Sequence, residues 1–227
     1  MTLTSQAVNI WMMAIVDING PIYEGMWTYG LPYAPFRMEE VPPVDWVAYP
    51  TYSQNIAMTV QTGTYLETGA HMFPGMRTID QLRPEELFLD AHIIYAGEKE
   101  PGSAIAREDF GQPEIPPGSA ILVCTGWGKN WESPWFLEDP PYFTAEAMDH
   151  LLSFAPALIG ADLPKWDSLA NPQGFFERFF RQDVLLLAPV MNLEAFGRET
   201  GKLIVLPLPI RGACASPARA ILMDRGL

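Results

Sequence analysis

Histidine, cysteine and basic side chains are scarce in this sequence. The 227 residues include three histidines and two cysteines, and 14 lysines and arginines stand against 27 aspartates and glutamates, for a formal charge of −13. Nucleic acid and anionic membrane surfaces would repel so acidic a chain, so we expect neither as a partner. With only Cys124 and Cys214 present, a disulfide framework is not indicated, and a reducing, cytoplasmic location is expected.

Long hydrophobic runs are also missing. The apolar stretch from Ile10 to Val16 is too short for a transmembrane helix, and it lacks the basic leader and small-residue cleavage site of a signal peptide. We expect this stretch to form a strand that ends at Asp17. The chain shows no internal repeat and no low-complexity segment.

Apolar residues and prolines are plentiful. Hydrophobic residues make up 48% of the sequence and aromatic residues 12%, which is enough for a substantial core, so disorder is not expected. Residues 20–50 are dense in proline, glycine and aromatic residues, including Trp27, Tyr29, Tyr33 and Trp46. Prolines at this density prevent a long helix and favour an extended arm that follows the surface.

Strand and helix patterns alternate over the rest of the chain. Apolar runs predict strands at residues 56–61, 91–95, 121–124, 158–159, 184–187, 203–206 and 218–223. Helices are predicted to begin at Pro84, to span residues 105–110, and to follow Thr144, whose hydroxyl suits a cap ahead of an apolar face. No composition break marks a second domain, so residues 1–227 are expected to form one α/β domain with a mixed sheet.

One short segment carries most of the polar side chains that could do chemistry. Gln61, Tyr65, Glu67 and His71 follow the strand predicted at residues 56–61, with glycines between them that allow tight backbone geometry. All four positions are odd, so in an extended segment they would share one face. We predict that the four side chains line one cavity. Taken alone, the pattern is also compatible with an ordinary turn.

The same segment resembles a family motif. The frame from Gln61 to His71 is similar to the His-Thr-Gly-Thr-His-x-Asp-x-Pro-x-His motif of the cyclase family of metal-dependent amide hydrolases, the family of bacterial kynurenine formamidase. Further landmarks follow in the family's order: Thr78-Ile79-Asp80, Pro117-Gly118 with Thr125-Gly126-Trp127, Gly160 to Asp167, and Ser216-Pro217-Ala218-Arg219-Ala220. Many short landmarks in order are more specific than any single one.

The resemblance implies a fold and an activity. The implied fold is the swivelling β/β/α architecture, a mixed β-sheet flanked by helices, in a homodimer or larger homo-oligomer. The implied activity is hydrolysis of a C–N amide bond in a small, aromatic substrate. In the family a metal ion activates water and a histidine moves the proton.

The departures from the motif concern its metal ligands. Of the motif's three histidines and one aspartate, only His71 is identical here, and a later family His and Glu fall near Phe176 and Ala188. His92 and His150 lie in a predicted strand and helix and are interpreted as structural. A di-zinc centre is therefore not expected. We predict either no metal, or one weakly held divalent ion bound by Gln61, Glu67 and His71, an oxygen-rich set that favours Mg, Ca or Mn over zinc.

Site roles follow from the resemblance. His71 would be the general acid/base, Glu67 its partner or a metal ligand, and Gln61 or Tyr65 would act at the carbonyl oxygen. Lys165 replaces a family serine and is predicted to lie within about 4 Å of Glu67, or to reach it through one water, in place of the missing cation. The predicted substrate-binding residues are Gln61, Thr64, Asp162, Trp27 and Tyr29.

Two alternatives remain open at this level. The chain could be a catalytically degenerate member that binds a small molecule or serves as an assembly subunit, as the lost His and Glu suggest. It could instead carry metal-free lyase or isomerase chemistry on Glu67, Lys165 and Tyr65. Because the motif is rewritten at most ligand positions, hydrolysis of formylkynurenine is expected to be weak or absent under any of these hypotheses.

Overall fold

The computed structural model describes residues 14–224. One mixed sheet dominates these residues, with the strand order β1-β12-β11-β5-β7-β9-β10-β4. Its strands are β1 (Ile15–Asp17), β4 (Tyr65–Glu67), β5 (Phe88–Tyr95), β7 (Ala120–Cys124), β9 (Leu158–Ala161), β10 (Leu185–Ala188), β11 (Thr200–Pro207) and β12 (Ala215–Met223). Strands β5, β7, β9 and β10 are parallel neighbours, and the other pairs are antiparallel.

The sheet closes on itself because β12 is long enough to pair twice. Residues 218–223 of β12 pair with β11, while residues 215–217 pair with β4. Seven strands thus form a barrel-like ring, and β1 lies on the same side of β12 as β4. This closure brings the C-terminal strand beside the segment that carries the predicted site.

Two apolar cores lie on opposite faces of the ring. One contains side chains from all seven ring strands, for example Leu66, Leu122 and Leu187, and only the inner face of a closed sheet can bring such residues into one cluster. The second covers the outer face with α1 (Ala145–Ser153) and α2 (Phe176–Arg181), with Met148 and Phe179 fully buried. The expected mixed sheet flanked by helices is confirmed.

Helix α1 forms as its sequence predicts. The Thr144 hydroxyl accepts a hydrogen bond from the Ala147 amide at 3.1 Å, and Ala147, Met148, Leu151 and Leu152 are buried against the outer core. The helices predicted at Pro84 and at residues 105–110 are single 3₁₀ turns, Pro84–Leu87 and Arg107–Phe110. The other short elements are 3₁₀ turns at Gly69–His71, Ile79–Gln81 and Trp127–Asn130, strands β6 (Ala104–Ile105) and β8 (Tyr142–Phe143), and helix α3 (Leu193–Phe196).

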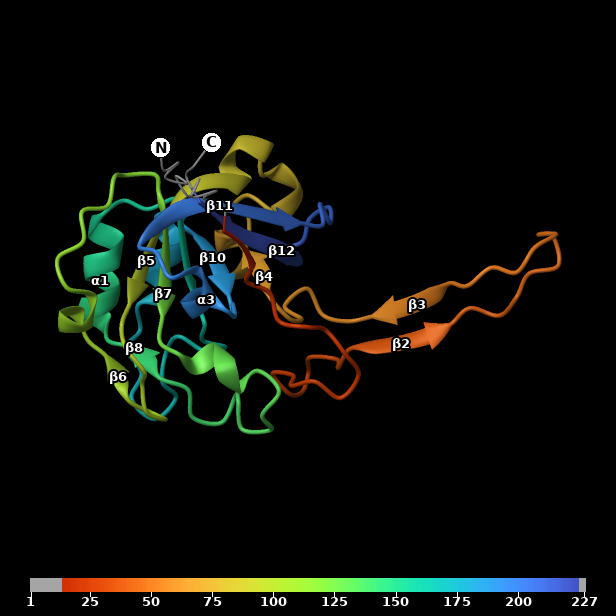
Figure 1. Cartoon of the computed structure of the whole chain (residues 1–227), viewed down its shortest axis with the longest axis horizontal. Coiled ribbons are helices and arrows are strands. Elements are labelled where there is room, and N and C mark those ends of the chain that lie inside the picture. Colours follow the sequence, from red (N-terminus) through yellow and green to blue (C-terminus); the bar gives the residue numbers. More distant parts are fainter. Residues whose placement is uncertain (1–13, 225–227) are drawn as a thin grey trace, which may run out of the picture.

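The N-terminal arm follows the body only in its first part, where Trp27 and Tyr29 pack, and then leaves the surface as a separate hairpin. Strands β2 (Arg37–Glu40) and β3 (Gln54–Ala57) pair only with each other and project from the body (Figure 1). The strand predicted at residues 56–61 is wrong, because β3 ends at Ala57 and the chain then turns through Gly63, whose φ is +69°. The strand predicted from Ile10 lies mostly outside the described residues; its described part is β1.

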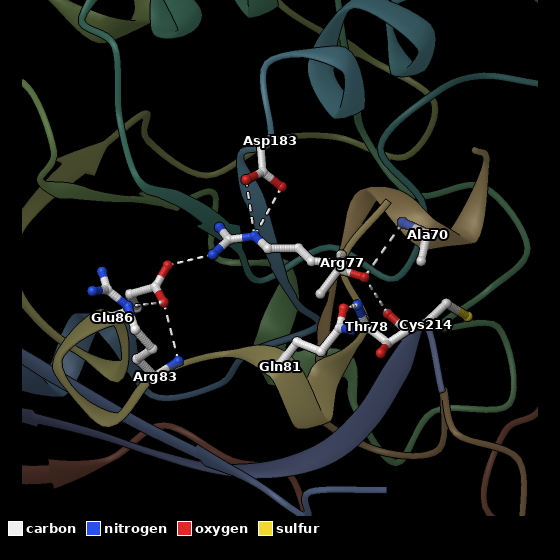
Figure 2. Close-up of polar contacts among 9 residues, drawn as sticks. Ala70, Arg77, Thr78, Gln81, Arg83, Glu86, Asp183 and Cys214 are labelled. Atoms are coloured by element: carbon white, nitrogen blue, oxygen red, sulfur yellow. Dashed lines mark hydrogen bonds and ion pairs between the residues drawn. The ribbon is translucent and has the colours of Figure 1, made fainter. Parts of the chain in front are cut away.

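A charged cluster anchors the segment that follows the motif. The Arg77 guanidinium contacts the Glu86 carboxylate and lies 2.8 Å from the Asp183 carboxylate, just before β10 (Figure 2). Glu86 also accepts hydrogen bonds from the backbone and side chain of Arg83. Because β10 pairs with β4, this cluster ties the segment after the motif to the strand next to β4.

No helix among residues 14–224 is long and apolar enough to cross a bilayer.

Candidate functional site

Strand β4 places the motif side chains by simple alternation. Leu66 points into the inner core, while Tyr65 joins the outer one, and Glu67 shares the parity of Tyr65. Glu67 lies opposite Leu186 of β10 and Ala215 of β12, so its backbone is held on both sides. All three β4 side chains are buried, and Glu67 is only 3% exposed.

His71 returns toward Glu67 through the 3₁₀ turn after β4. Thr68 caps this turn by accepting a hydrogen bond from the Ala70 amide. The turn brings His71 Nδ1 to 3.1 Å from Glu67 Oε1. From the other side, Gln61 Nε2 donates to the same carboxyl oxygen at 2.6 Å.

The four motif side chains therefore converge, but not for the reason that we expected. Tyr65 and Glu67 do share a face of an extended strand. Gln61 lies in the turn before the strand and His71 in the turn after it, so alternation does not apply to these two. Folding of the turns, rather than parity, brings the ends of the motif together.

These side chains line a cavity of about 550 Å³ on the outer face of the sheet. Its lining is largely aromatic and apolar: Tyr29, Tyr33, Gln61, Tyr65, Glu67, His71, Met72, Pro164, Lys165, Trp166, Asp167, Ser168, Leu169, Pro172, Phe176, Phe180, Leu186 and Ala188. Phe176 and Ala188, at the positions where the family resemblance places a His and a Glu, are both in this wall. They offer no ligand atom, so that side of the cavity is apolar.

Burial makes the acid–base pair neutral at pH 7. Desolvation raises the pKa of Glu67 to about 8, although the hydrogen bond from Gln61 opposes it. Desolvation also lowers the pKa of His71. At neutral pH the carboxyl group therefore holds a proton and the imidazole does not, and the 3.1 Å contact is a hydrogen bond rather than an ion pair.

Tyr29 and Tyr65 remain protonated in the cavity. Burial raises the pKa of both Tyr65 and Tyr29 well above the usual range of a phenol. Tyr29 gives its single hydroxyl proton to the Pro164 carbonyl at 2.8 Å, so Tyr65 is the donor in the 3.2 Å contact between the two hydroxyl groups. A phenolate ligand for a metal is disfavoured at either position.

Three predicted substrate-binding residues lie outside the cavity lining. Thr64 donates to the Pro189 carbonyl at 2.6 Å, and Trp27 packs edge-on against Trp131. Asp162 is fully buried and accepts hydrogen bonds from the Thr125 amide and hydroxyl. These side chains are occupied in packing and local hydrogen bonds. Of the predicted substrate-binding set, Tyr29 and Gln61 line the cavity.

The prediction that Lys165 pairs directly with Glu67 is wrong. Lys165 lines the cavity, but its ammonium donates to the Leu137 carbonyl at 2.6 Å, and no ion pair within residues 14–224 joins it to Glu67. Burial of Glu67 is tolerated because the carboxyl group keeps its proton at neutral pH and accepts a hydrogen bond from Gln61. Lyase chemistry that needs a free Lys165 amine next to Glu67 loses its support.

A third potential metal ligand comes from the far end of the chain. Carboxylate, imidazole and thiol atoms of Glu67, His71 and Cys214 lie within 4.8 Å of one another. This donor set fits one divalent ion better than the predicted set with Gln61, whose amide nitrogen faces Glu67. Cys214 precedes the Ser216-Pro217 landmark, but only the β12–β4 pairing shows that it reaches the motif.

Comparisons with known proteins agree with this architecture. The family model described as "Putative cyclase" matches residues 16–168. The kynurenine formamidase of Geobacillus thermodenitrificans is 26% identical over 172 residues, which cover 75% of this chain and 79% of that protein. The kynurenine formamidase of Bacillus cereus is 25% identical over 212 residues, covering 91% and 96% of the two chains.

Solved structures share the fold. Isatin hydrolase A from Labrenzia aggregata, bound to benzyl benzoate, superposes with a TM-score of 0.79 at 22% identity, covering 93% of this chain and 94% of that one. A structure described as a potential metal-dependent hydrolase with cyclase activity gives a TM-score of 0.76 at 20% identity, covering 95% of this chain and 100% of that one. Since the family model spans well over half of the sequence, the chain belongs to the Cyclase family.

Proposed function

We propose that this protein hydrolyses a C–N amide bond of a small aromatic substrate in the cavity beside β4. The observation that carries the proposal is the Glu67–His71 pair, 3.1 Å apart, in the wall of a largely aromatic cavity of about 550 Å³. A cavity of this size suits a drug-sized ligand. The names of the relatives, kynurenine formamidase and isatin hydrolase, support the same bond class.

His71 and Glu67 would handle the proton. The neutral imidazole can take a proton from a water molecule as its oxygen attacks the amide carbonyl, and can then give that proton to the departing nitrogen. Glu67, at Nδ1, would orient the ring. Tyr65 would donate to the oxygen that gains negative charge by turning its hydroxyl group from Tyr29 to the substrate. With a divalent ion in the site, Glu67 and His71 would be its ligands instead of the proton carriers, and the ion would supply Lewis-acid polarisation of the carbonyl.

The cavity lining favours substrates without charged head groups. Lys165 already donates to Leu137, and Asp167 accepts hydrogen bonds from the Gln173 and Gly174 amides. The Asp167 carboxylate is thus taken up by backbone amides, the Lys165 ammonium is held toward Leu137 by one of its three N–H groups, and the remaining wall is mostly apolar. We therefore propose that an aromatic ring amide is a better substrate than formylkynurenine.

Steady-state kinetics test this proposal. Isatin, as a ring amide, and formylkynurenine would be assayed with the wild type, His71→Ala and the control His150→Ala, which changes a histidine outside the cavity. We expect turnover of the ring amide, a loss of about 100-fold or more in kcat/KM for His71→Ala, and little change for His150→Ala. Tight ligand binding without turnover would instead support a binding protein.

We also propose that the protein forms a homodimer or larger homo-oligomer through its arm. The β2–β3 hairpin projects from the body and exposes Trp46 and Tyr52, which are 84% and 92% accessible (Figure 1). A two-stranded ribbon that pairs with no other strand of the described residues is marginally stable in water, so a second copy of this chain would stabilise it. This surface is what supports the proposal.

A further inference from the structure

The contacts of one imidazole nitrogen distinguish two kinds of chemistry. His71 Nδ1 lies 3.1 Å from Glu67 Oε1 and 3.9 Å from Cys214 Sγ. In a thiol–histidine–carboxylate relay, the carboxylate holds one ring nitrogen and the thiol approaches the other. Here both groups approach the same nitrogen, so this arrangement cannot relay a proton from the thiol to the carboxylate.

Donors that converge on one point are instead what a cation requires. With zinc-like bond lengths and tetrahedral angles, the ligand atoms would be separated by roughly 3.3 Å for nitrogen and oxygen and about 3.6 Å for nitrogen and sulfur. The corresponding separations in this structure are 3.1 and 3.9 Å. Movements of a few tenths of an ångström would therefore bring these two pairs to coordination distances.

The backbone holds the third donor in place. The Cys214 carbonyl accepts hydrogen bonds from the Thr68 amide at 2.8 Å and from the Thr68 hydroxyl at 3.1 Å. Figure 2 shows Cys214 beside the turn that contains Ala70. The next residue, Ala215, pairs directly with Glu67. Because these backbone contacts tie the segment of Glu67 and His71 to that of Cys214, little ordering remains to be done when an ion binds.

We propose that Glu67, His71 and Cys214 bind one thiophilic divalent cation of the zinc, cobalt and cadmium class. The thiol takes over a ligand role in a motif that has lost two of its histidines. A sulfur ligand shifts preference away from Mg²⁺ and Ca²⁺, which favour oxygen, toward zinc-like ions. The proposal rests on the proposed function and deepens it, because two of the three ligands, Glu67 and His71, are the residues of the proposed active site.

The other cysteine provides an internal control. Cys124, Asp162 and Glu194 also bring three potential ligand atoms together. However, the Asp162 carboxylate is already occupied by the Thr125 amide and hydroxyl, and its second oxygen lies 3.4 Å from the Gly128 amide. Cys124 belongs to this second group and not to the proposed site, so Cys124→Ala removes a thiol and leaves the three proposed ligands in place.

A cobalt titration of the full-length protein, after chelation and dialysis, tests the proposal. We expect one Co²⁺ per chain with a thiolate-to-cobalt charge-transfer band in the near ultraviolet. Cys214→Ser should lose this band and weaken Co²⁺ binding by about tenfold or more, while Cys124→Ala should keep both. Circular dichroism and thermal unfolding would verify that each variant is folded. Co²⁺ bound without the band, a Cys214→Ser variant that keeps it, or no bound Co²⁺ would overturn the proposal.

The readouts separate this proposal from the proposed function. A thiolate band in a protein that hydrolyses no amide would support the ion site and contradict the hydrolase. Hydrolysis that persists in the chelated protein, with no band on adding Co²⁺, would support the hydrolase and contradict the ion site.

Discussion

Glu67 is a carboxyl group in a buried position, where desolvation makes its ionised form unfavourable. It is almost fully buried, its hydrogen-bonding neighbours are a neutral amide and a neutral imidazole, and no cation among the described residues pairs with it. The raised pKa of about 8 means that, without a metal ion, the group holds its proton at neutral pH. A divalent cation would reverse this preference, so the protonation of Glu67 and the occupancy of the site are linked.

This linkage predicts a pH-dependent stability of the metal-free protein. Above pH 7 the unfolded chain has an ionised Glu67, whereas the folded chain keeps the proton until about pH 8, so folding stability falls as the pH rises. Between pH 7 and pH 9 the wild type should lose roughly 1.4 kcal/mol relative to Glu67→Gln. Urea unfolding in the presence of a chelator measures the difference.

Glu86→Gln is a suitable comparison for that experiment. Hydrogen bonds from Arg77 and Arg83 outweigh desolvation and lower the pKa of Glu86 to about 2, far below the tested range. The stability difference between this variant and the wild type should not change between pH 7 and pH 9. If the difference for Glu67→Gln is equally flat, Glu67 is ionised in the folded protein at pH 7.

At the scale of elements, strand β4 shows how a very short element can carry a site. Its three residues have neighbours on both sides, β10 and β12, and the turns at its ends add Gln61 and His71. The Arg77 cluster joins the segment after His71 to the residues before β10. The site therefore depends on contacts between segments that are distant in the sequence.

Removal of Arg77 should destabilise the fold measurably. Its guanidinium joins two carboxylates and is about three-quarters buried, so Arg77→Ala would leave Glu86 and Asp183 without this partner. We expect a loss of about 1–2 kcal/mol in urea unfolding. The matched control is Arg178→Ala, because the Arg178–Asp149 pair is about half exposed on both sides and should contribute less than about 0.5 kcal/mol. Equal effects of the two substitutions would show that the Arg77 cluster is no more than a surface ion pair.

At the scale of the whole molecule, the β2–β3 hairpin is the feature that a compact monomer does not explain, because its two strands pair only with each other and it projects from the body. If a second copy covers the arm, Trp46→Ser combined with Tyr52→Ser should shift the protein toward monomer. Light scattering after size-exclusion chromatography measures this mass. Leu208→Ser changes an exposed apolar residue on the body and should leave the mass unchanged. A wild type that is monomeric at high concentration would refute the proposal of an oligomer.

Local patterns were sufficient for several parts of the fold. Thr144 and the apolar face behind it predicted α1, because a cap and a 3.6-residue period depend only on near neighbours. The longer apolar runs predicted β5, β7 and β12 within a few residues. The order of short landmarks also predicted the family and the mixed sheet. The density of prolines in residues 20–50 excluded a long helix in the arm.

The details of the site depended on contacts that no local pattern encodes. Strand β4 is only three residues long and is stabilised by pairing with β10 and β12, which no local pattern shows. The apolar pattern therefore predicted a strand at residues 56–61, just before it. The direction of the Lys165 side chain depended on a carbonyl at Leu137, and the approach of Cys214 depended on the closure of the ring. The sequence by itself determined which side chains could take part in chemistry; the tertiary structure decided which of them meet, because the distances between them are set by pairing between distant strands.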